Sequence, residues 1–194
     1  MTKKEIIWRE ILYQAIEKKK TEFTQKELAQ QFGFSLSTIF NSLKVPRQAG
    51  AVRVGGRNFE VQDAEKFLYL WATHRNLEKE TIYKTNISFS RKEAEGILPP
   101  SVVFACYSAY RKKYNEEPAD YDKVFVYSGP QKLAEIKKRF PFKKGYVNFT
   151  VLKSDPHLHE FGQTTPDVQT FVDLWNLNDW YAKEFLNALK DKIF

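Results

Sequence analysis

The 194-residue sequence has one cysteine, Cys106, and little glycine or proline, with eight of each. A single thiol excludes an internal disulfide and a zinc site built on several cysteines, so we expect a reducing, cytoplasmic location. The low glycine and proline content excludes collagen-like and linker-like chains. No segment approaches the roughly 20 apolar residues that span a bilayer. Arg9 and Glu10 interrupt the first apolar run, so we expect neither a signal peptide nor a membrane segment.

The sequence does contain enough apolar residues for a core, and its charge is unevenly distributed. Hydrophobic residues make up 42%, which excludes disorder as the state of the whole chain. The formal net charge is +7, and residues 1–76 carry 13 basic against 8 acidic side chains, whereas residues 77–194 carry 18 against 16. No acidic residue lies between Glu27 and Glu60. This acid-free stretch indicates a surface for a polyanion, with a merely solvated basic face as the alternative.

The first segment predicts a helix followed by a helix-turn-helix. Apolar residues at helical spacing predict a helix over 4–19. Thr24 and Glu27 form a capping box for a short helix that Gly33 ends, because glycine adopts the left-handed conformation without strain. A second short helix follows, capped by Ser35 or Ser37. Its inward stripe is expected to be Leu36, Ile39 and Leu43, and Pro46 ends or kinks it.

The stretch from Ala51 to Val61 predicts a β-hairpin. A four-residue loop over 55–58 places both apolar pairs on one face and an opposite-charge pair on the other. The resulting pairs are Val54 with Phe59, Arg53 with Glu60, and Val52 with Val61. Because Glu60 at least partly neutralises Arg53, we do not count Arg53 as a contact to a partner. Asp63 caps a further helix, so residues 4–76 follow the order of a winged helix domain.

Such a domain binds duplex DNA by placing a helix in the major groove, where Asn pairs with adenine and Lys or Arg with guanine. Phe40 either packs against the first helix or contacts a thymine methyl group. The plain alternative for the whole module is a domain or dimer interface. The expected DNA-binding residues are Ser37, Thr38, Asn41, Lys44, Arg47, Gln48, Arg57 and Asn58.

Residues 77–194 predict a small α/β layer domain, because strand-like and helix-like segments alternate. The expected strands are 82–89, 123–127 and 146–152, and the expected helices are 99–114, 130–138, 168–174 and one after an Asp179 cap. The chain is thus expected to be α/β with two domains, an N-terminal winged helix-turn-helix over 1–76 and a small α/β layer domain over 77–194.

No catalytic constellation emerges from the sequence, so we expect no enzyme, no cofactor and no metal site. His157 and His159 could form a metal pair, but a polar loop is the preferred interpretation because they lack helical spacing. Cys106 lies in an apolar segment, where cysteine is usually a small buried hydrophobe.

Several second-domain segments carry a resemblance to a known family. They are Leu98-Pro-Pro-Ser-Val102 leading into Tyr110-Arg111, then Ala119-Asp-Tyr-Asp-Lys-Val124, Tyr146-Val-Asn-Phe-Thr-Val-Leu152, Asp155, and Thr165-Pro-Asp-Val-Gln-Thr-Phe-Val-Asp-Leu174. With them the chain resembles the AbiEi-type antitoxins, the transcriptional-regulator half of abortive-infection systems of bacteria and archaea. The most specific segment is the one that contains Gln169 and Asp173.

The resemblance implies a transcriptional regulator whose winged helix binds inverted repeats in double-stranded DNA at its own promoter. It also implies a second domain that counters a nucleotidyltransferase-type toxin, without necessarily touching it. Gln169 and Asp173 are the candidate motif residues of that domain, with a capping or interdomain hydrogen-bond pair as the alternative. Two other functions stay open: a ligand-sensing winged helix regulator, and an RNA-binding accessory protein.

Overall fold

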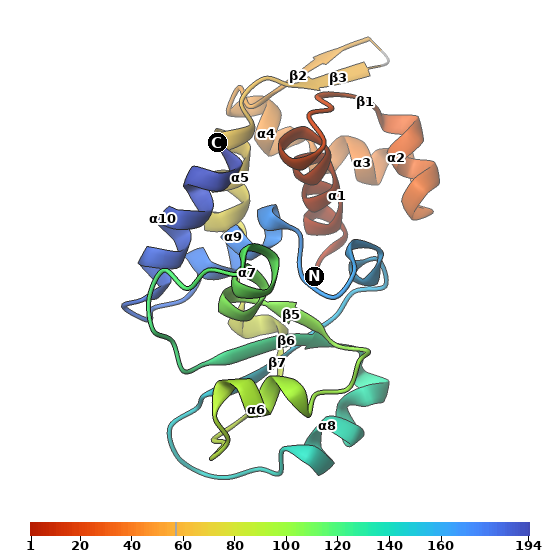
Figure 1. Ribbon diagram of the computed structural model, residues 1–194. Coiled ribbons are helices and arrows are strands. Elements are labelled where there is room, and N and C mark those ends of the chain that lie inside the picture. Colours follow the sequence, from red (N-terminus) through yellow and green to blue (C-terminus); the bar gives the residue numbers. More distant parts are fainter. Residues whose placement is uncertain (57) are drawn as a thin grey trace. The chain divides into compact units, whose positions relative to one another are not determined.

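Figure 1 shows the computed structural model of the chain, which describes residues 1–56 and 58–194. It is a mixed α/β protein, about 51% helix and 16% strand, with one three-stranded and one four-stranded sheet. The chain divides into two compact units. The N-terminal unit contains residues 2–75 and 193–194, and the C-terminal unit contains Met1 and residues 76–192. Within the described residues, no helix is both long and apolar enough to cross a membrane.

The N-terminal unit begins with α1 (Lys3–Leu12), which continues into a π-helical turn, η1 (Tyr13–Glu17). A capping box between Thr2 and Glu5 starts α1. The indole N–H of the fully buried Trp8 donates a hydrogen bond of 2.7 Å to the carbonyl of Ser42. This bond links the middle of α1 to the end of α3 (Leu36–Ser42), so the first helix holds the second short helix in place.

Two short helices follow as predicted, α2 (Gln25–Phe32) and then α3. The Thr24 capping box is present, and Gly33 ends α2 with a left-handed φ of 64°. Ile39 and Leu43 are buried as expected, but the prediction for Leu36 is wrong, since it is 56% exposed. The Cα–Cβ bonds of a helix tilt toward its N-terminus, so a side chain in the first turn is directed away from the rest of the helix.

The α-helical conformation is interrupted at Leu43, and the chain becomes helical again in α4 (Lys44–Gln48). Pro46 therefore lies in the first turn of α4, where backbone N–H groups have no helical acceptor and proline is tolerated. The second helix thus ends at Ser42, before Pro46 is reached, so the prediction that Pro46 ends it is wrong, and Pro46 belongs to a short third helix.

The three-stranded sheet has the order β1-β3-β2 and is antiparallel. Its strands are β1 (Glu22–Thr24), β2 (Val52–Gly55) and β3 (Asn58–Val61). All three predicted cross-strand pairs are present. The predicted four-residue loop is wrong, because Gly55 also pairs with Asn58. Gly56 adopts a left-handed φ of 55°, which lets the chain reverse in a shorter connection.

The N-terminal unit also contains α5 (Ala64–His74), and the expected Asp63 cap accepts from the backbone of Lys66 at 2.8 Å. Strand β1 is an element that the sequence analysis did not predict. It pairs Phe23 with Phe59, whose rings stack at 5.3 Å. The third strand therefore fixes the hairpin on one side.

The C-terminal unit is built on a four-stranded sheet of order β4-β7-β6-β5, in which only β6 and β7 are parallel. The strands are β4 (Thr81–Thr85), β5 (Val103–Ala105), β6 (Val124–Ser128) and β7 (Phe149–Lys153). Every residue of β6 is buried, as its continuous apolar run predicts.

Helices accompany this sheet in the C-terminal unit. They are α6 (Arg91–Gly96), α7 (Cys106–Tyr114), α8 (Leu133–Arg139), α9 (Asp167–Trp175) and α10 (Ala182–Ile193), with short 3-10 turns η2 (Glu78–Glu80), η3 (Pro130–Lys132) and η4 (Leu158–Phe161). Ala94 of α6 and Ile136 of α8 pack in one apolar cluster with Val124, Val126 and Val151 of the sheet. Helix α7 contacts β5, β6 and α9.

Two predictions for this unit are wrong. The expected helix over 99–114 is shorter than predicted, because Val103 to Ala105 form a strand paired with β6 and the helix starts only at Cys106. β-branched side chains favour a strand when a partner strand is present. The second wrong prediction is the Asp179 cap. Helix α10 begins at Ala182, and the Asp179 carboxylate accepts hydrogen bonds from Tyr107 and Lys123.

Candidate nucleic-acid interface

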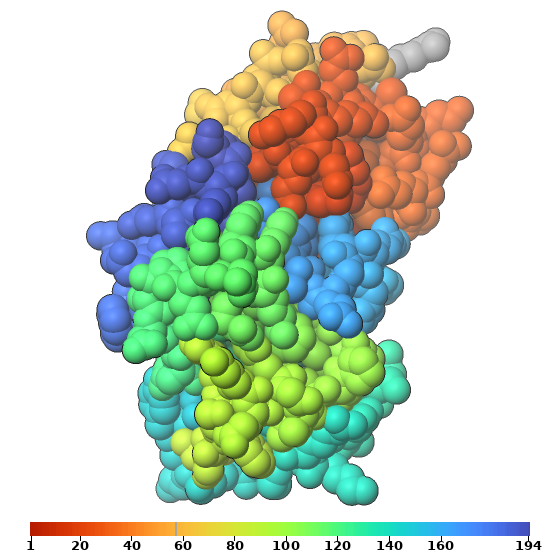
Figure 2. Space-filling view, in the orientation of Figure 1, coloured from red at the N-terminus to blue at the C-terminus, as the bar shows by residue number. Residues whose placement is uncertain are grey.

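The predicted DNA-binding residues of the second short helix lie on two consecutive helices, α3 and α4. Helix α3 carries Ser37, Thr38 and Asn41, and α4 carries Lys44, Arg47 and Gln48. All six are exposed except Thr38, which is half-buried. Figure 2 shows the space-filling surface of the molecule, on which the orange N-terminal segment is visible. The face that α3 and α4 present to solvent, called here the α3–α4 face, is therefore accessible to a partner.

The first turn of α3 is fixed by a cluster of hydroxyl groups. Ser35 Oγ caps the helix by accepting from the backbone N–H of Thr38 at 3.2 Å. The same oxygen lies 3.0 Å from Ser37 Oγ and 2.9 Å from Thr38 Oγ1. This arrangement holds two of the predicted contact residues in a defined orientation at the start of the helix.

Apolar side chains are also exposed on the α3–α4 face. Leu36 is 56%, Phe40 47% and Val45 43% exposed. The exposure of Phe40 disfavours packing against the first helix and favours the alternative of an apolar contact, such as one to a thymine methyl group. The Nζ of Lys44 lies 5.8 Å from the Phe40 ring centroid. The sequence did not indicate that Leu36 and Val45 are exposed, because helical spacing alone does not distinguish buried from exposed apolar positions here.

The charges of the α3–α4 face differ from those of the hairpin. Within the described part of the chain, neither Lys44 nor Arg47 has a carboxylate within 4.0 Å. Arg53 instead forms an ion pair of 2.8 Å with Glu60, which confirms the prediction that Glu60 at least partly neutralises it. Glu22 lies opposite Glu60 in the sheet register. Positive charge without a local counter-charge is thus carried by α4 rather than by the flank of the hairpin.

The predicted hairpin tip is only partly described. Asn58 is exposed and pairs with Gly55 at the end of the two strands. Arg57, the other predicted contact at the tip, lies outside the described residues.

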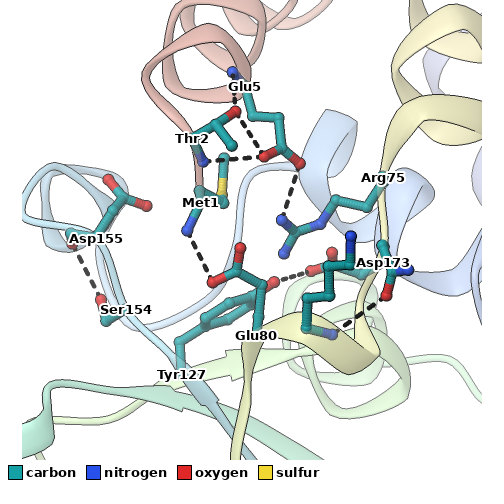
Figure 3. A network of polar contacts seen from close by, with 11 residues as sticks. Met1, Thr2, Glu5, Arg75, Glu80, Tyr127, Ser154, Asp155 and Asp173 are labelled. Atoms are coloured by element: carbon teal, nitrogen blue, oxygen red, sulfur yellow. Dashed lines mark hydrogen bonds and ion pairs between the residues drawn. The ribbon is translucent and has the colours of Figure 1, made fainter.

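Gln169 and Asp173, the candidate motif residues of the C-terminal unit, are fully buried in α9. Asp173 accepts a hydrogen bond of 2.7 Å from the hydroxyl of Tyr127, a residue of β6 (Figure 3). A buried carboxylate with a strand partner stabilises the packing of α9 on the sheet. The buried positions of Gln169 and Asp173 favour a structural role over contact with a ligand.

The side chains considered for catalysis or metal binding do not come together. Cys106 is fully buried, and His157 lies 2.8 Å from Glu160 in a local pair. No group of three or more histidine, cysteine or acidic side chains that could hold a metal ion occurs in residues 1–56 and 58–194.

Two cavities lie within the C-terminal unit, and Asp179, which forms an ion pair with Lys123, lines both of them. The first has a volume of about 480 Å³ and is lined by Lys84 and Asn176 as well as by this pair. The second has a volume of about 450 Å³ and is walled mainly by aromatic side chains. The sequence analysis predicted neither cavity, because their walls come from segments far apart in the chain.

Comparisons of the chain with protein-family models, with curated proteins and with solved structures found no match.

Proposed function

We propose that the protein is a sequence-specific regulator that binds double-stranded DNA through its N-terminal unit, acting as a winged helix-turn-helix domain. In this proposal α2 and α3 form the helix-turn-helix, α3 enters the major groove, and the hairpin of β2 and β3 is the wing. The order of helices and strands supports this assignment. The protein is proposed to act in the cytoplasm and not as an enzyme.

The observation that carries the proposal is the chemistry of the α3–α4 face. Asn41 is exposed on α3, and Lys44 and Arg47 follow on α4 without a carboxylate neighbour among the described residues. An exposed amide supplies the paired donor and acceptor that adenine requires in the major groove. Unpaired cations on the next helix supply contacts to phosphates, which orient the protein on the duplex.

The finer proposal follows the resemblance to AbiEi-type antitoxins. The protein then represses its own promoter by binding inverted repeats, which requires two copies related by twofold symmetry. The C-terminal unit opposes a nucleotidyltransferase-type toxin, with or without direct contact. The burial of Gln169 and Asp173 supports a structural role for the segment with the strongest resemblance.

The experiment that tests DNA binding is a titration at two salt concentrations. Random-sequence duplexes are first selected on the immobilised protein, and the enriched duplex is compared with a scrambled one of equal length. We expect preference for the enriched duplex and a steep loss of affinity as salt rises, because phosphate contacts release counterions. No enrichment, or an affinity independent of salt, would reject the proposal. A preference for structured RNA over the duplex would favour the RNA-binding alternative.

The 480 Å³ cavity favours a second candidate function, a regulator that senses a small molecule. Its volume is in the range of ordinary ligand sites. Lys84 and Lys123 line it, each paired with a carboxylate, Glu78 and Asp179 respectively. A ligand of this cavity would raise the melting temperature and change affinity for the enriched duplex together.

A further inference from the structure

The 450 Å³ cavity of the C-terminal unit combines exposed aromatic rings with carboxylates. Two of its four rings, those of Tyr121 and Tyr181, are buried, and the other two belong to Tyr146, which precedes β7, and Trp180, which precedes α10. Trp180 is 73% and Tyr146 57% exposed. Large exposed aromatic side chains around a hollow mark a binding site, because they leave apolar surface in water.

One carboxylate of the cavity is held in position by the rings. Asp122 Oδ1 accepts hydrogen bonds from the hydroxyls of Tyr181 at 2.7 Å and Tyr146 at 3.3 Å. Burial raises the pKa of the Tyr181 hydroxyl, and the bond to Asp122 adds to that effect, so this donor stays protonated. Asp122 Oδ2 has no hydrogen-bond partner among the described residues. A fixed carboxylate with one free oxygen is suited to accept from a cationic donor.

The charges around the cavity are not balanced. Asp120 is exposed and has neither an ion pair nor a hydrogen bond among the described residues. Asp122 is hydrogen-bonded only to neutral hydroxyls in the same part of the chain. The third carboxylate, Asp179, is already paired with Lys123. Two of the three carboxylates therefore have no ion-pair partner among the described residues, although Lys123 acts on Asp122 electrostatically.

Two lining residues of the cavity, Tyr146 and Asp179, already hold a cation, Lys123, which is not itself part of the lining. The Nζ of Lys123 lies 5.4 Å from the ring centroid of Tyr146 and pairs with Asp179. A cation is thus held by an aromatic ring and a carboxylate that both line the cavity. Trp180, the best of the aromatic residues for a cation, has no such occupant among the described residues.

We propose that this cavity, the Trp180 pocket, binds an arginine side chain of a partner protein. The guanidinium group lies over the Trp180 indole and donates to the free oxygen of Asp122 and to Asp120. Arginine fits better than lysine, because its planar group both stacks on a ring and donates to carboxylates. The same carboxylates repel nucleic acid, so this site is separate from the proposed DNA interface and does not depend on it.

The experiment uses the full chain and three capped tripeptides, Gly-Arg-Gly, Gly-Lys-Gly and Gly-citrulline-Gly. Binding is followed by the indole N–H signal of Trp180, assigned by its loss in Trp180→Phe. We expect the arginine peptide to shift this signal and the citrulline peptide, which has the same shape without charge, to bind about tenfold more weakly. A signal unmoved by the arginine peptide, or equal affinity for citrulline or lysine, would overturn the proposal.

A double variant, Asp120→Asn with Asp122→Asn, tests the carboxylates. It is expected to weaken binding of the arginine peptide about tenfold. Asp191→Asn, an exposed carboxylate of α10 outside the cavity lining, is the matched control and is expected to leave binding unchanged. Equal effects of the two changes would contradict the site.

Other occupants would be recognised by the same measurements. A Trp180 shift caused by oligothymidylate and not by the arginine peptide would assign the rings to base stacking. Self-association that the double variant abolishes would make the occupant a second copy of this chain. Either result would show that the proposed arginine of a separate partner is wrong.

Discussion

At the scale of single residues, the contribution of a basic side chain to duplex binding depends on its neighbours. Arg47 and Arg53 belong to the same acid-free sequence stretch, yet only Arg53 has a carboxylate partner among the described residues, at 2.8 Å. An arginine that is already paired gains less from a phosphate, because the existing pair must be broken or shared. The two residues are therefore a matched pair for a test.

We predict that Arg47→Gln weakens binding to all duplexes and reduces the slope of log affinity against log salt by about 0.9, the value for one phosphate contact. Arg53→Gln is expected to change the slope by much less. Titrations of a labelled duplex at several salt concentrations measure both. Equal slopes in the two variants would remove Arg47 from the DNA-contacting set.

Asn41 is the residue best placed to recognise a base. It is exposed on α3, between the hydroxyl cluster at Ser35 and the cations of α4. We predict that Asn41→Ala lowers affinity for the enriched duplex by roughly 1–3 kcal/mol and relaxes the choice of one base pair. Competition with singly substituted duplexes measures this. Asn187→Ala, an exposed amide of α10, is the control and is expected to leave base preference unchanged. Unaltered preference in Asn41→Ala would mean that another residue recognises the base.

At the scale of elements, local capping fixes the start of the proposed helix-turn-helix. Thr24 Oγ1 accepts from the backbone N–H of Glu27 at 3.1 Å, and Glu27 accepts from the backbone N–H of Thr24. Both bonds satisfy N–H groups that a helix end leaves without a partner. The start of α2 is therefore stabilised by residues adjacent in the sequence.

We predict that Thr24→Ala destabilises the protein by about 1 kcal/mol. For a unit of about 60–100 residues, the size class of the N-terminal unit, this corresponds to a melting temperature lower by about 4–8 °C. Thr21→Ala is the control, because Thr21 is exposed and its backbone carbonyl, not its hydroxyl, bonds to Val61. Thermal unfolding followed by circular dichroism compares the two. Similar losses in both variants would contradict a specific role of the cap.

Some elements of the fold can be predicted from the sequence, and others cannot. The register of β2 and β3 followed from the alternation of apolar and charged residues, because a shift by one residue would move every side chain to the other face. The strand β5 was missed, because three apolar residues fit a helix or a strand equally well by spacing. Pairing with β6, whose partner residues are 20 to 24 positions away in the chain, decides its conformation.

At the scale of the whole molecule, the stability of the N-terminal unit includes one buried ion pair between distant segments. Glu5 of α1 and Arg75, just after α5, meet at 3.0 Å, and both side chains are buried (Figure 3). Burial alone would raise the pKa of the Glu5 carboxyl. The charge of Arg75 and the hydrogen bonds from Thr2 outweigh burial and hold this pKa below its ordinary value.

This lowered pKa makes the stability of the protein depend on pH. A carboxyl with a lower pKa in the folded state stabilises fully above its unfolded pKa of about 4.3, and the contribution is lost as pH falls through the folded value. We predict that Glu5→Gln lowers the free energy of unfolding at pH 7 by about 1.5–3 kcal/mol. The difference from the unmodified protein is expected to shrink below pH 4.

Urea unfolding at pH 7 and at pH 3, followed by tryptophan fluorescence, measures the difference. Glu22→Gln is the control, because Glu22 is exposed on β1. It is expected to have a small effect at both values of pH. A loss in Glu5→Gln that is the same at pH 7 and pH 3 would mean that the charge of Glu5 does not stabilise the fold.

The sequence by itself determined the features that depend on near neighbours. The caps at Thr24 and Asp63, the left-handed Gly33 and the hairpin register all follow from residues within a few positions of one another. The acid-free stretch likewise predicted where exposed positive charge lies. Local hydrogen bonding and side-chain periodicity are short-range effects, so one sequence suffices to predict them.

Only the tertiary structure decided which side chains are exposed and which distant ones meet. Helical spacing placed Leu36 inside, but its position in the first turn of α3 leaves it in solvent. In the Trp180 pocket the hydroxyl of Tyr181 lies 2.7 Å from Oδ1 of Asp122, although the two residues are 59 positions apart in the chain. Burial and long-range contact depend on how elements pack, which no local pattern in a single sequence specifies.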